Sequence, residues 1–152
     1  MFSGEASIEI SAPAEVIYDL VADVTSTGER SPECRRVEWI GAPGAAVGAR
    51  FRGRNQWRGF VWWRRATIVR ADRGHEFVFR TEPARFIYHD STEWRYRLAP
   101  ASEGTVRVTE SYEVDAPRWI RAMDAVLGRR NALQQGMRRT LVALKESAEQ
   151  LA

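Results

Sequence analysis

Glu110 has the clearest potential for acid or base chemistry in this sequence. It lies in the alternating segment 104–114, GTVRVTESYEV, where Val106 and Val108 predict the buried face of a strand. Because side chains alternate across a strand, Glu110 and Tyr112 fall on that same face. A carboxyl group buried without a partner is costly, so it either pairs with a cation or becomes protonated. Tyr112 is expected to be a packed tyrosine or a hydrogen-bond donor to a ligand carbonyl.

Two residues on neighbouring segments could partner Glu110. Phe51 places Asn55 on the inner face of its strand, and Val69 places Thr67, Arg65 and Trp63 on the inner face of the next. We expect Arg65 to lie within charge-assisted hydrogen-bond reach of Glu110, so that Glu110→Gln would destabilise the fold. The pair is either structural or part of a ligand-orienting or acid/base site. The candidate catalytic residues are therefore Glu110, Tyr112 and Arg65.

Aromatic side chains dominate the same predicted face. Such a surface suits a flat, mostly apolar molecule with one or two oxygens that fix its orientation. The alternative is that each aromatic ring simply belongs to the core. Trp94 and Tyr112 are expected to contribute more to binding than the arginines of 50–73. The expected ligand-binding residues are Asn55, Trp63, Arg65, Phe77, Phe79, Trp94, Tyr96, Glu110 and Tyr112, with Asp90 on the same face.

Other chemistry finds little support in the sequence. His75 follows a turn and His89 shares a face with Ser91 and Glu93, so both are expected to point to solvent. Cys34 has no inward histidine to activate it as a nucleophile. No set of inward histidines and carboxylates has metal-ligand spacing, so we expect neither a metal nor a cofactor.

Composition narrows the class of protein. The chain has 152 residues, of which 44% are hydrophobic and 28% charged, and we expect a single folded domain over residues 1–152. A lone cysteine excludes an intramolecular disulfide. No apolar stretch approaches the ~20 residues that cross a bilayer, and the N-terminus lacks a signal-peptide pattern. We therefore expect a cytoplasmic protein without membrane insertion.

The charge is unevenly distributed along the chain. The net charge is +3, yet residues 50–73 contain eight arginines and one acidic residue. A basic segment raises the question of nucleic acid. These arginines alternate with apolar residues at strand spacing and match no recognition motif, so no nucleic-acid partner is expected.

Hydrophobic periodicity predicts the elements that position these residues. Helical spacing predicts short helices over 13–22 and 25–30 and one long helix over 117–148, in which Gly128 and Gly136 mark a kink or close packing. Short turn-like separators between the strands indicate an antiparallel meander. The strands are expected at 3–11, 34–40, 49–58, 60–71, 75–82, 86–98 and 104–114.

Four segments in this order of elements carry a family resemblance: SIEISAPAEVIYDLVADV (7–24), SPECRRVEWI (31–40), GARFRGRN (48–55) and GTVRVTESYEV (104–114). They resemble the START-like SRPBCC superfamily and, within it, the bacterial polyketide cyclase/dehydrase family, over residues 3 to about 148. The resemblance implies an α+β helix-grip (START/Bet v 1-like) fold. In that fold a seven-stranded curved antiparallel sheet surrounds a long C-terminal helix, two short helices lie between strands one and two, and a deep ligand cavity separates sheet from helix.

Fold resemblance alone leaves three functions open. The first is a carrier or sensor that binds a hydrophobic, aromatic or polyketide-like small molecule, including a lipid. The second is a polyketide aromatase/cyclase or dehydratase that uses acid/base residues in the same cavity. The third is an interaction module. A homodimer is compatible with each of them.

Overall fold

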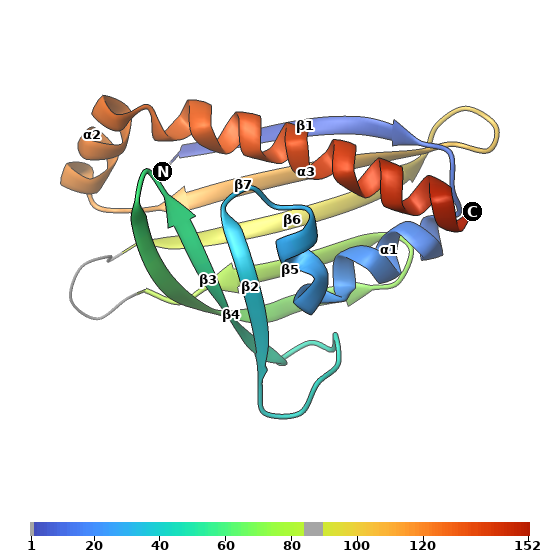
Figure 1. The fold of residues 1–152 in the computed structure, drawn as a ribbon, viewed down its shortest axis with the longest axis horizontal. Helices are drawn as coiled ribbons and strands as arrows, with labels where there is room; N and C mark the ends of the chain where they lie inside the picture. The colour runs from blue at the N-terminus through green and yellow to red at the C-terminus, as the bar shows by residue number, and fades with distance from the viewer. Residues whose placement is uncertain (1, 84–89) are drawn as a thin grey trace.

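The computed structural model describes residues 2–83 and 90–152. In this part of the chain, seven strands form one antiparallel sheet in the order β1-β7-β6-β5-β4-β3-β2, which confirms the predicted meander (Figure 1). Residues 86–89, expected to begin the sixth strand and to include a solvent-facing His89, lie outside the described residues. The strands are β1 (Phe2–Ile10), β2 (Cys34–Ile40), β3 (Arg50–Trp57), β4 (Phe60–Asp72), β5 (Glu76–Thr81), β6 (Ser91–Pro100) and β7 (Val106–Asp115).

Helices connect and cover this sheet. The two short helices expected between the first strands are present as α1 (Ala14–Ala22) and the 3-10 helix η1 (Val24–Glu29). The long C-terminal helix expected over 117–148 is present, and it is divided at Gly128, one of the two glycines expected to mark a kink or close packing, into α2 (Arg118–Leu127) and α3 (Arg129–Leu151). Gly128 separates them with a φ of +72°, a left-handed conformation that an L side chain disfavours.

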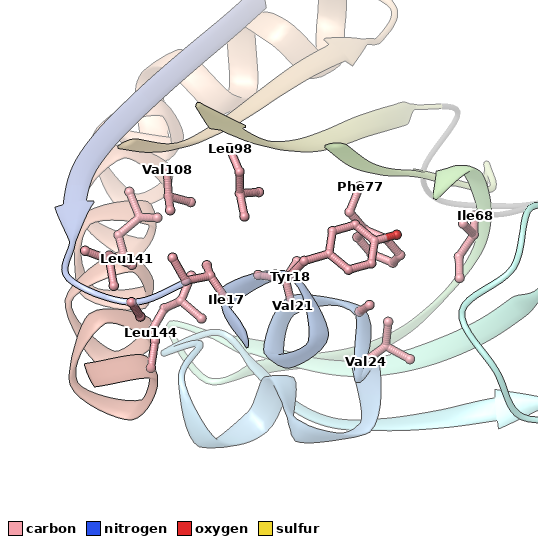
Figure 2. Close-up of a cluster of buried hydrophobic side chains, with 14 of the residues drawn as sticks. Ile17, Tyr18, Val21, Val24, Ile68, Phe77, Leu98, Val108, Leu141 and Leu144 are labelled. Atoms are coloured by element: carbon pink, nitrogen blue, oxygen red, sulfur yellow. The ribbon is translucent and has the colours of Figure 1, made fainter. Parts of the chain in front are cut away.

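The main core lies where α1, α3 and the sheet meet (Figure 2). Ile17 and Tyr18 of α1 face the sheet, and Leu141 and Leu144 close the core from α3. The Tyr18 ring meets Phe77 edge to face, with the ring centroids 6.0 Å apart. Since α1 covers only one end of the inner face, the other end, under α2 and the first half of α3, is available for a cavity.

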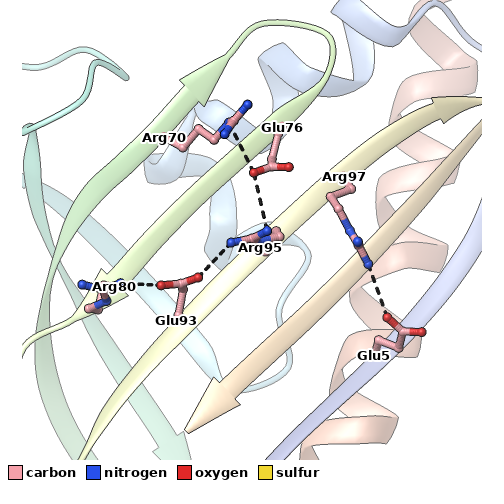
Figure 3. A network of polar contacts seen from close by, with 7 residues as sticks. All are labelled: Glu5, Arg70, Glu76, Arg80, Glu93, Arg95 and Arg97. Carbon is pink, nitrogen blue, oxygen red and sulfur yellow. Dashed lines mark hydrogen bonds and ion pairs between the residues drawn. The ribbon is translucent and has the colours of Figure 1, made fainter. Parts of the chain in front are cut away.

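The outer face of the sheet is charged. Arg95 lies between Glu76 and Glu93, and Glu93 also binds Arg80 with a 2.6 Å N···O distance (Figure 3). Exposed ion pairs of this kind contribute at most about 1 kcal/mol each. Their main consequence is that carboxylates neutralise arginines locally on this side of the sheet.

The two glycines of the C-terminal segment are expected to respond oppositely to alanine. Gly128→Ala should lower the free energy of unfolding by about 1 kcal/mol, because alanine must adopt a positive φ there. Gly136→Ala should raise it by roughly 0.5–1 kcal/mol, since alanine favours the helix interior. A Cβ at position 136 meets only Pro32 Cγ, at 3.7 Å. Urea unfolding of both variants measures the two changes, and equal signs would contradict this account of the helix break.

Candidate functional site

A cavity of about 890 Å³ lies between the inner face of the sheet and helices α2 and α3. It occupies the place that the sequence predicts for it, and the small residues Gly53 and Ala66 border it as expected. Its wall also includes the turn between β3 and β4 and the segment between η1 and β2. The aromatic residues around it are Phe2, Phe51, Trp57, Phe60, Trp62, Phe79, Trp94, Tyr96 and Trp119.

Glu110 borders this cavity from β7. The side chain is buried, and its Oε1 accepts a hydrogen bond of 2.9 Å from the Tyr96 hydroxyl of β6, while Oε2 has no partner among the described residues. Burial raises the pKa of Glu110 to about 8, although the Tyr96 hydrogen bond acts in the opposite direction. The inward position predicted for Glu110 is confirmed, and the raised pKa favours the neutral carboxylic acid at pH 7.

The predicted orientation of Arg65 and Trp63 is wrong. Directly paired residues of an antiparallel sheet share a face, and Phe51 pairs with Ala66 while Gly53 pairs with Arg64. Ala66, Arg64 and Trp62 therefore face inward. Arg65 and Trp63 face outward and are exposed, so the expected ion pair between Arg65 and Glu110 does not form.

A β-bulge explains this error. Ile68 pairs with Phe79 and Arg70 pairs with Val78, so Val69 is an extra residue of β4 without an opposite partner on β5. Val69 is 38% exposed. It is apolar like its neighbour Ile68, and the sequence offers no local signal that favours Ile68 as the inward residue.

The other expected ligand-binding residues divide into two groups. Those bordering the cavity are Asn55, Phe79, Trp94, Tyr96 and Glu110, with Asp90 beside them. Phe77 and Tyr112 are buried but belong to the core. Tyr112 packs with Leu133 and Met137 under α3, in the space left by Gly4, where a Cβ would lie 2.9 Å from the Tyr112 hydroxyl. The expected role of Tyr112 as a major ligand contact therefore has no geometric basis.

Two ion pairs at the cavity wall were not predicted from the sequence. Arg64 binds Asp90, with 3.1 Å from Nη1 to Oδ1, and also donates from Nη2 to the Asp90 carbonyl. Arg129, the first residue of α3, lies 2.6 Å from a Glu33 oxygen and places its guanidinium 4.7 Å from the centre of the Trp57 ring. Through these two contacts Arg129 fixes the start of α3 against the end of β3 and the segment before β2.

The remaining reactive side chains are poor catalysts in this arrangement. Burial raises the pKa of the Cys34 thiol to about 11, which keeps it protonated. His75 is exposed on the surface, as expected. In residues 2–83 and 90–152, no three histidine, cysteine, aspartate or glutamate side chains gather as a metal site would require.

None of the helices described in these residues combines the length and apolar composition needed to cross a membrane.

Comparison with known proteins agrees with this architecture. The family model described as polyketide cyclase / dehydrase and lipid transport matches residues 1–149. No curated protein matches the chain in sequence. A Thermus thermophilus protein, TTHA0849, is 18% identical with a TM-score of 0.74 and 99% coverage of both chains. A START superfamily protein of Mycobacterium smegmatis is 16% identical with a TM-score of 0.69 and 99% coverage of both.

A third similar structure is the di-domain ARO/CYC BexL from the BE-7585A biosynthetic pathway. It is 22% identical with a TM-score of 0.69, and the match covers 97% of this chain but 50% of BexL. At these identities the three structures establish a shared fold and nothing finer.

Proposed function

Since the chain belongs to the polyketide cyclase/dehydrase and lipid transport family, we propose that it binds a hydrophobic, largely planar small molecule as a carrier or sensor. The observation that carries this proposal is the cavity itself. Its volume of about 890 Å³ falls in the range of small-molecule sites, and rings from β3, β4, β5 and β6 surround it. Aromatic walls favour a flat apolar ligand, and Asn55, Arg64 and Glu110 offer polar contacts that would orient it.

Filling the cavity tests this function. Gly136 of α3 borders the cavity and its Cβ position is almost free of contacts, so Gly136→Leu should place an isobutyl group against the ligand. We expect the neutral fluorescent probe N-phenyl-1-naphthylamine to bind the wild type and to bind this variant roughly tenfold more weakly. Asn131→Leu adds the same side chain at an exposed position of the same helix and should leave binding unchanged. A wild type that does not bind the probe, or a Gly136→Leu variant that binds normally, would contradict the proposal.

A second candidate function, acid-catalysed cyclisation or dehydration, is favoured by the state of Glu110. A neutral carboxylic acid at the cavity wall can give its proton to a carbonyl oxygen, or to a departing β-hydroxyl that leaves as water. In the second case the carboxylate that remains can accept the α-proton, so that the C=C bond forms and the acid is restored. Tyr96 holds the carboxyl through Oε1, so the proton on Oε2 is the one available for transfer. Because the acid form is required, activity should fall as the pH rises through about 8.

Product analysis with a β-hydroxy ketone as substrate separates the two functions. An enzyme would form the unsaturated ketone, and Glu110→Gln would lower the rate by roughly 100-fold while leaving binding of the neutral probe intact. A carrier or sensor would bind the ketone and return it unchanged, with no difference between wild type and variant.

A further inference from the structure

We propose that the ligand of this cavity is an amphipathic organic anion, whose apolar body fills the cavity and whose acid group binds Arg30. This inference rests on the proposed binding function and adds the charge of the ligand to it. The inference is argued from the arginines that border the cavity. The alternation of residues along the strands did not predict these arginines as site residues.

The charge of the wall is the first argument. Six arginines border the cavity against four carboxyl groups, Glu33, Asp90, Glu110 and Asp124. With Glu110 protonated, three carboxylates remain, which leaves an excess of three positive charges. Two of the arginines form ion pairs with Glu33 and Asp90. The others, Arg30, Arg35, Arg58 and Arg139, have no carboxylate partner among the described residues.

Arg30 differs from the other three because it is partly buried. It follows η1, and its Nη2 donates to the Leu20 carbonyl at 2.9 Å and to the Ser26 hydroxyl at 2.9 Å. Both acceptors are neutral, so they fix the guanidinium without cancelling its charge. The positive charge of Arg30 lowers the pKa of the Tyr96 hydroxyl, although burial raises that pKa by more. Arg30 is therefore a positioned cation at the cavity wall, and its charge acts on Tyr96.

A partly buried cation beside an apolar cavity is costly unless an anion accompanies it. On the outer face of the sheet, several arginines have a glutamate beside them, although Arg54 and Arg65 do not in the described part of the chain. There, Arg70, Arg80, Arg95 and Arg97 each contact a glutamate (Figure 3). The missing carboxylate beside Arg30 is consistent with a ligand that supplies one.

The three exposed arginines at the cavity wall add a steering effect. Arg35, Arg58 and Arg139 come from β2, the β3–β4 turn and α3, and they remain hydrated. Like charges arranged around an opening attract an oppositely charged ligand and raise its association rate. A carboxylate, sulfonate or phosphate on an aromatic or aliphatic body has the required chemistry.

Two probes with one aromatic scaffold test the inference. 1-Anilinonaphthalene-8-sulfonate carries a sulfonate that N-phenyl-1-naphthylamine lacks. We expect the sulfonate probe to bind the wild type roughly tenfold more tightly, with an affinity that falls as KCl is added, and the neutral probe to be insensitive to salt. Arg30→Gln should weaken binding of the sulfonate probe roughly tenfold and change binding of the neutral probe less than about twofold.

Arg65→Gln is the matched control, because it removes one exposed arginine on the outer face of the sheet and should affect neither probe. Equal affinities of the two probes for the wild type, or equal losses for both in Arg30→Gln, would overturn the anion inference while leaving the binding function intact. Failure of the wild type to bind either probe would overturn both. If Arg30→Gln does not fold, the salt dependence of the wild type still tests whether the ligand is an anion.

Discussion

Glu110→Gln is expected to stabilise the protein at pH 7 by about 1 to 3 kcal/mol. In the folded state the carboxyl holds its proton up to about pH 8, whereas in the unfolded chain it ionises near its ordinary pKa of 4.5. Folding at pH 7 must therefore take up a proton, which costs roughly 3 kcal/mol for a pKa difference of this size. Glutamine reproduces the neutral acid without that cost.

The sign of the pH dependence follows from the raised pKa. Between about pH 4.5 and 8 the folded state binds one more proton than the unfolded state, so wild-type stability should decrease as the pH rises through this window. The variant lacks the group. The difference between variant and wild type should thus be small at pH 5, grow towards pH 8 and then level off.

Urea unfolding at pH 5, 7 and 8 measures this difference. Tyr96→Phe serves as a control, because it removes the hydroxyl that donates to Glu110 Oε1 and should destabilise the fold by about 1 to 3 kcal/mol. A stability difference between Glu110→Gln and wild type that does not change with pH would show that the carboxyl does not titrate in this window.

The sequence alone predicts the opposite sign for this substitution, and the reason is local. Alternation in β7 correctly places Glu110 inward, because Val106 and Val108 are the apolar residues of one face without competition from the other. In β4, however, Ile68 and Val69 are adjacent apolar residues, so residue type does not indicate which of them faces inward. The structure places a bulge at Val69 and turns Ile68 inward. Choosing Val69 exchanges Arg64 with Arg65 and Trp62 with Trp63.

Strand boundaries and their order were predictable for a different reason. Turn residues such as Gly59 and Gly74, both with positive φ, separate the strands and are visible in the sequence. The break at Gly128 is less visible, because a glycine inside a helical pattern either kinks the helix, packs closely or ends it. Arg30 was not predictable as a site residue, since its position depends on contacts with Leu20 of α1 and Ser26 of η1, which alternation along a strand does not indicate.

Trp62→Ala is expected to weaken binding of N-phenyl-1-naphthylamine strongly, whereas Trp63→Ala is not. Trp62 borders the cavity, and Trp63 is 45% exposed on the opposite face, where the Arg52 guanidinium lies 5.0 Å from the centre of its ring. At about 25 cal/mol per Å², a loss of roughly 80 Å² of ligand contact weakens binding by about 2 kcal/mol, or roughly 30-fold.

These adjacent tryptophans form a matched pair, because the same atoms are removed from the same strand on opposite faces. Trp94→Ala provides a second test from β6, and it should weaken binding by a similar factor, since Trp94 also borders the cavity. Circular dichroism and thermal unfolding of each variant establish that it is folded. If Trp63→Ala lost binding and Trp62→Ala retained it, β4 would have the opposite orientation in solution. Arg65 rather than Arg64 would then face the ligand, and the ion pair of Arg65 with Glu110 would again be the expected arrangement.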